Sequence, residues 1–136
     1  MLFRMGLVLI LLAGCGPSSS EDFKEQGKTL SRHLLAELQS IHSRDELTKA
    51  TPRFQMIFDE MVSVMIATRE FAEKHPKSEM TELNDEDHHQ SEELRFELNR
   101  IYKIDGCREI IEKSQRQPLQ RLDIYEKRRE KKRMRF

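Results

Sequence analysis

The chain has 136 residues, which is enough for one domain and too short for two of ordinary size. It carries 24 Lys and Arg residues against 24 Asp and Glu residues, so no overall field favours binding to nucleic acid. Tryptophan is absent, glycine and proline are few, and charged residues make up 35% of the chain. This composition is typical of an all-α domain with a modest hydrophobic core.

Residues 1–14 have the layout of a secretory signal peptide. One positive charge, Arg4, precedes an apolar run that ends at two small residues, Ala13 and Gly14. The run is about half as long as the hydrocarbon core of a bilayer is thick. We therefore expect a leader that is removed and not a transmembrane helix.

Leu12-Ala13-Gly14-Cys15, at the end of this leader, resembles the lipobox of bacterial lipoprotein precursors. The resemblance implies cleavage between Gly14 and Cys15, a diacylglyceryl thioether on Cys15 and, commonly, a further acyl chain on the new amino group. Two chains suffice for stable anchoring. The resemblance thus implies a protein held by lipid in the cell membrane or outer membrane, with its domain outside the cytoplasm and residues 15–20 as a tether.

A lipid on Cys15 would leave Cys107 as the only thiol, so no disulfide could form within the chain. An exported cysteine of this kind is either a buried small apolar residue or a crosslink between copies. We favour burial because Cys107 shares a helical face with Ile111.

Helical segments are predicted throughout residues 21–125, the span expected to form the folded domain. In 21–42, apolar residues recur at helical spacing along one face: Phe23, Leu30, Leu34, Leu38 and Ile41. Ser43 and Glu46 have the spacing of a capping box that restarts the helix. Thr51-Pro52 predicts a further helix start.

The clearest helix follows Pro52. Its apolar stripe consists of Phe54, Phe58, Met61, Met65 and Ala72. Lys74 and His75, just before Pro76, mark its end.

A third helix is predicted to begin at Asn84, an N-cap followed by an acidic first turn. Its inward-facing residues are Leu94, Leu98, Ile101 and Tyr102, and Asp105-Gly106 predicts its C-cap and a turn. In the fourth segment Pro118 is expected to kink or divide the helix. Since strand-like alternation is absent, an antiparallel bundle of three to four helices is the fold that buries each apolar face.

A short acidic stretch contains the first candidate site. His88 and His89 lie one helical turn before Glu92 and Glu93, and such imidazole and carboxylate pairs can ligate a divalent metal ion. The other interpretation, which we favour, is a solvated helix start whose negative charge suits the helix dipole. An exported protein that binds a metal or another small ligand through His88, His89, Glu92 and Glu93 is therefore the alternative hypothesis.

Motifs for other chemistry are missing. Covalent c-type haem attachment is excluded because no Cys-x-x-Cys-His occurs. Gly-x-Ser-x-Gly, P-loop and His-Glu-x-x-His motifs do not occur either. We expect a protein without enzymatic activity and without a cofactor other than the covalent lipid on Cys15.

Residues 126–136 are predicted to form a basic tail. Seven bases stand there against Glu126 and Glu130: Lys127, Arg128, Arg129, Lys131, Lys132, Arg133 and Arg135. The tail is either a helix end whose cations suit the dipole or an anion-binding arm. Outside the cytoplasm, an arm of this kind would meet anionic lipid, the cell wall, an acidic envelope protein or the acidic third helix of a second copy. The leading hypothesis is therefore a non-enzymatic, lipid-anchored helical module that acts through envelope contacts.

Overall fold

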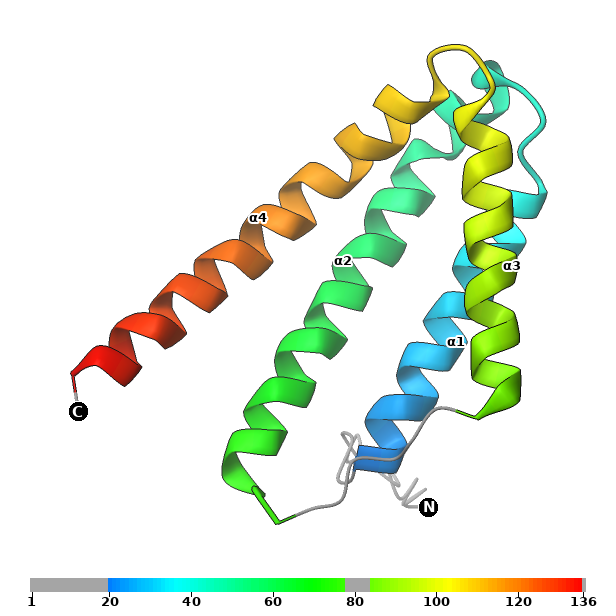
Figure 1. The fold of residues 1–136 in the computed structure, drawn as a ribbon. Coiled ribbons are helices and arrows are strands. Elements are labelled where there is room, and N and C mark those ends of the chain that lie inside the picture. The colour runs from blue at the N-terminus through cyan, green and yellow to red at the C-terminus, as the bar shows by residue number, and fades with distance from the viewer. Residues whose placement is uncertain (1–19, 78–83, 136) are drawn as a thin grey trace, which may run out of the picture.

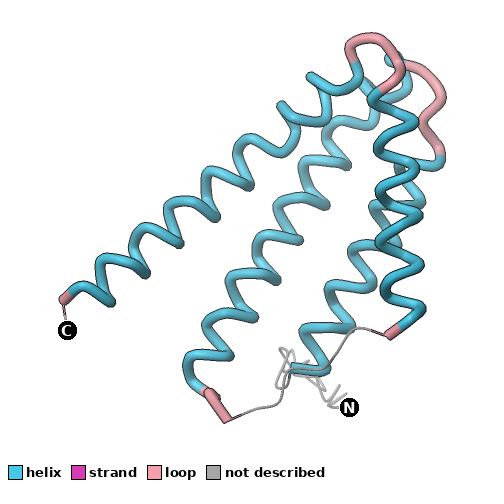
Figure 2. The backbone as a smooth tube through the Cα atoms, in the orientation of Figure 1, coloured by secondary structure: helices cyan, strands magenta, loops and turns pink. Residues whose placement is uncertain are grey.

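The computed structural model describes residues 20–77 and 84–135. In these ranges the chain forms helices and no strand: α1 (Ser20–Gln39), α2 (Arg44–Lys74), α3 (Asp85–Tyr102) and α4 (Cys107–Met134). Figure 2 shows the short loops that join α1 to α2 and α3 to α4. The all-α bundle is therefore confirmed, whereas the leader, Gly14 and Cys15 lie outside the described residues.

Successive helices run antiparallel (Figure 1). α2 packs against both α1 and α4, whereas α3 packs mainly against α1. α3 and α4 meet near the loop that joins them and diverge toward their other ends (Figure 1). We call the end that carries the α1–α2 and α3–α4 loops the loop end, and the end where α1 begins and α4 finishes the terminal end.

The hydrophobic core is densest toward the loop end. Side chains with at most 2% exposure come from every helix and from the α1–α2 loop: Leu38, Ile41, Leu47, Phe54, Ile101, Cys107 and Ile111. The stripe predicted on the first helix is buried from Phe23 to Ile41. The core residues of the described ranges begin at Phe23, so a chain that starts at residue 16 contains all of them.

The stripe predicted on α2 is buried only over its first half. Phe54 and Phe58 are 0% and 8% exposed, whereas Met65 is 43% exposed and Ala72 lies on the surface. Met65 lines an open hollow between α2, α1 and the start of α3, because α3 packs on α1 and not on α2. Periodicity therefore identified the correct face but not how far along α2 that face is covered.

Three predicted helix boundaries are confirmed by their hydrogen bonds. Ser43 Oγ accepts from the Glu46 backbone N–H at 3.2 Å, and Glu46 Oε2 accepts from the N–H of His42 at 2.7 Å. Asn84 and Asp87 cap α3 reciprocally, with both N–O distances at 2.9 Å. α2 ends at Lys74 and His75, as predicted.

Neither internal proline ends a helix. Thr51-Pro52 does not start a new one, since α2 is continuous from Arg44. Thr48, whose carbonyl would accept from residue 52, is exposed, so water can hydrate the carbonyl that Pro52 leaves unbonded.

The prediction that Pro118 could divide the fourth segment is also wrong, because α4 runs from Cys107 to Met134. Packing on α2 holds both sides of the proline. Ile111 and Ser114 are buried before it, and Arg121 bonds to α2 after it. The expected boundary between domain and tail at 125/126 accordingly falls inside a helix.

Gly106 has a different place from the one predicted. α3 ends at Tyr102, and Gly106 is the residue before α4 rather than the C-cap of α3. Its φ is 77°, a left-handed conformation that favours glycine.

Candidate anion-binding site at the end of α4

The basic tail of the sequence forms the last turns of α4. Two ion pairs join this part of the helix to α2. Arg129 Nε lies 2.5 Å from Glu73 Oε1, and Glu126 pairs with Arg69. A third pair, Lys127 Nζ to Asp123 Oδ2 at 3.0 Å, lies within α4. The cations of this segment are therefore carried by a helix attached to the bundle.

Most of these cations have no acidic partner among the described residues. No ion pair within residues 20–77 and 84–135 involves five of the seven: Arg128, Lys131, Lys132, Arg133 and Arg135. All five are exposed. We call these five residues, with Lys127 and Arg129, the basic end. Its position at the terminal end of the bundle is visible in Figure 1.

An open hollow of about 650 Å³ lies between the basic end and α2. α4 contributes the aromatic and basic lining, and α2 contributes two carboxylates: Tyr125, Arg128, Arg129, Lys132, Arg133, Glu70 and Glu73. Glu73 is already paired with Arg129. Positive charge exceeds negative charge in the lining, so the hollow favours an anion.

The metal candidates of the sequence are only partly brought together. His89 Nε2 lies 2.7 Å from Glu93 Oε1; the His89 side chain is largely exposed and that of Glu93 is partly exposed. Among the described residues, no three His, Cys, Asp or Glu side chains form a group that could hold a metal ion. His88 and Glu92 therefore do not complete a site with the His89–Glu93 pair.

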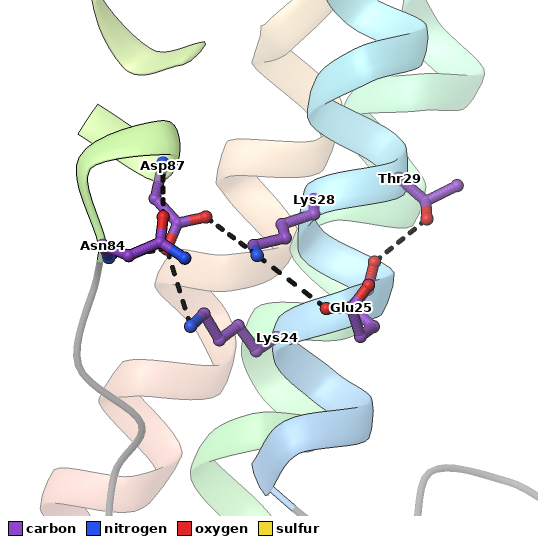
Figure 3. A network of polar contacts seen from close by, with 6 residues as sticks. All are labelled: Lys24, Glu25, Lys28, Thr29, Asn84 and Asp87. Atoms are coloured by element: carbon purple, nitrogen blue, oxygen red, sulfur yellow. Dashed lines mark hydrogen bonds and ion pairs between the residues drawn. The ribbon is translucent and has the colours of Figure 1, made fainter. Parts of the chain in front are cut away.

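The neighbouring Asp87 turns toward α1 instead (Figure 3). Its Oδ1 lies 3.0 Å from Lys28 Nζ and its Oδ2 lies 3.5 Å from Lys24 Nζ. The hydrogen bond from the Asn84 N–H, with the help of Lys28, lowers the pKa of Asp87 despite its burial. The hydrogen bond to Asp87 in turn raises the pKa of Lys28.

This network joins the start of α3 to α1. The sequence pattern does not identify Lys24 and Lys28 as partners of Asp87. The capping spacing from Asn84 to Asp87 predicts the helix start. However, nothing in the local pattern links Asp87 to lysines about sixty residues earlier in the chain.

Cys107 is buried, as expected for a small apolar residue. It is 0% exposed, and this burial raises the pKa of its thiol, an effect that the charge of Arg44 only partly offsets. The thiolate that would react in a crosslink is thus disfavoured in the folded chain.

No helix in the described ranges is both long and apolar enough to span a bilayer. The chain matches no known protein family, and no curated protein or solved structure shows significant similarity to it.

Proposed function

We propose that this protein is a lipid-anchored, non-enzymatic module of the bacterial envelope whose basic end contacts anionic groups at the membrane surface. The observation that supports this proposal is the placement of the two chain ends. α1 begins and α4 finishes at the same end of the bundle (Figure 1). A lipid on Cys15 would therefore hold the basic end toward the membrane rather than away from it.

The length of the tether strengthens this argument. Cys15 precedes Ser20 by five residues, which span at most about 18 Å when fully extended. The attraction between exposed cations and an anionic surface falls off within a Debye length, which is about 8 Å at physiological ionic strength. A short tether thus keeps the terminal end close to the distance at which the basic end is effective.

The two attachments would act together. Acyl chains partition into the bilayer, and a basic patch adds attraction to anionic headgroups. The basic end would then set which side of the bundle faces the membrane, leaving the loop end exposed to other envelope components.

Metabolic labelling tests the anchor. Cells that produce the full-length protein are grown with an alkyne analogue of palmitate, and the purified protein is assayed for the label. The natural protein should be labelled and Cys15→Ala should not. Cys107→Ala is the matched control, since it removes the other cysteine and should be labelled normally. Label on Cys15→Ala, or no label on the natural protein, would contradict the anchor.

Vesicle binding tests the charge contact without interference from the lipid. A chain that starts at residue 16 is mixed with phosphatidylglycerol vesicles or with neutral phosphatidylcholine vesicles at low and high salt. Retention should require the anionic lipid and decrease as salt increases. Equal retention on neutral vesicles, or retention that salt does not change, would overturn the charge contact.

Substitution is a better tool than truncation for the basic end. Arg129 forms an ion pair with Glu73 on α2, so removing the end of α4 also removes this contact between the helices. Replacement of the cations by glutamine removes charge while keeping a good helix former.

A further inference from the structure

We infer that the hollow between α2 and α4 is a binding site for the phosphate group of an anionic phospholipid headgroup. This inference rests on the proposed function and makes it more specific. It replaces a diffuse attraction between a basic helix and a membrane with a site formed by named side chains.

The arrangement of cations on α4 supports a site. Arg128 and Lys132 are one helical turn apart, as are Arg129 and Arg133, so each pair lies on one side of the helix. All four line the hollow. Lys131 and Arg135 belong to the same helix end but do not line the hollow. Only some of the cations of this segment therefore cluster around the hollow.

The lining of the hollow carries a surplus of positive charge. Arg129 forms an ion pair with Glu73. Arg128, Lys132 and Arg133 remain without an ion pair to a described residue, and Glu70 is the other acid of the lining. Three free cations against one remaining carboxylate leave a surplus of positive charge, which a phosphate group would neutralise.

The chemistry of the lining suits phosphate in particular. Guanidinium groups present parallel N–H donors that match two phosphate oxygens, and the phenol of Tyr125 supplies a further donor type. A volume of about 650 Å³ is in the range of small-ligand pockets, roughly 300–1,000 Å³. The hollow is therefore larger than a lone phosphate needs and can accept the headgroup that carries it.

A pair of double variants separates a site from diffuse charge. Arg128→Gln with Arg133→Gln removes two cations that line the hollow. Lys131→Gln with Arg135→Gln removes two from the same helix end outside it. Both are made in the chain that starts at residue 16, and thermal unfolding establishes that each still folds. Dissociation constants are measured on phosphatidylglycerol vesicles at fixed salt.

The lining variant should weaken binding at least about tenfold more than the control variant, which loses only the diffuse attraction of two surface cations. Equal weakening by both variants would overturn the site while leaving the proposed charge contact intact. No weakening by either variant would overturn both.

Two further measurements identify the ligand. Vesicles given the same surface charge with oleate, which carries a carboxylate, should bind more weakly than phosphatidylglycerol vesicles. This preference should disappear in the lining variant. Equal binding to both vesicles would overturn phosphate recognition. Inorganic phosphate should compete with the vesicles for the protein no better than sulfate does at equal ionic strength. Displacement of the protein from vesicles by millimolar phosphate alone would assign the hollow to free phosphate instead of lipid.

Discussion

Replacing Phe54 by alanine tests where the core lies. Phe54 is 0% exposed and its ring centroid lies 6.3 Å from that of Phe58. Truncation of a buried phenylalanine removes its transfer free energy and leaves a cavity, so we expect a loss of roughly 3–5 kcal/mol in unfolding free energy. At about 4 °C per kcal/mol for a domain of about 100 residues, the melting temperature should decrease by roughly 12–20 °C.

Met65→Ala is the matched control because Met65 belongs to the same stripe of α2. Its side chain is 43% exposed, so truncation removes fewer contacts and should cost less than about 1 kcal/mol. Urea unfolding followed by circular dichroism, in the chain that starts at residue 16, gives both free energies with a check that the m-values agree.

Equal losses at the two positions would refute this reasoning. They would mean that the face of α2 is covered along its whole length and that no open hollow exists beside Met65. A loss below about 1 kcal/mol for Phe54→Ala would also contradict the position of Phe54 in the core, since truncation of a fully buried phenylalanine costs more than that.

The remaining predictions concern Asp87, Gly106, Gly27 and Cys107. The pKa of Asp87 is lowered on folding, so the unfolded chain takes up a proton first as the pH decreases. The stabilisation by Asp87 is therefore present above about pH 4 and is lost as the pH falls through the folded-state pKa. Urea unfolding at pH 7 and pH 3 should show this loss of stability. The Asp87→Asn variant should lack the contribution of Asp87 to the loss. Gly106→Ala should cost about 1–2 kcal/mol in the same assay because φ is 77°, and its new Cβ would lie 2.9 Å from Arg44 Cζ. Gly27→Ala, with open space around the new Cβ, should instead stabilise α1 by about 0.5–1 kcal/mol. A Gly106→Ala variant more stable than the Gly27→Ala variant would contradict the geometry. Iodoacetamide should modify Cys107 only in urea, as measured by mass spectrometry, and rapid modification without urea would contradict its burial.

The sequence predicts the fold well where the physics is local. Helical periodicity identifies the buried face of α1, and the side chains of Ser43 and Asn84 identify the starts of α2 and α3. These features depend on residues within one or two turns of each other. The fold class follows, because each amphipathic helix needs a partner.

The errors occur where a distant part of the chain decides the outcome. Thr51-Pro52 predicts a helix start and Pro118 a kink or break, but α2 and α4 both continue through these prolines. At Pro118, packing on α2 holds both sides of the proline. The exposure of Met65 depends on where α3 packs relative to α2, which the stripe on α2 does not reveal.

The candidate site shows the same division. Counting charges identifies the basic residues at the end of α4, such as Arg128 and Arg133. It does not identify the hollow, because Glu70 and Glu73 are supplied by α2 more than fifty residues earlier. Whether a basic segment forms a site depends on the helix beside it.

The concentration of the core toward the loop end also has consequences for how the bundle opens. Backbone amides near Leu38, Phe54 and Ile101 should exchange hydrogen only when the whole domain unfolds, whereas amides near the terminal end should exchange through smaller openings. An opening confined to the terminal end would leave the structure of the loop end intact.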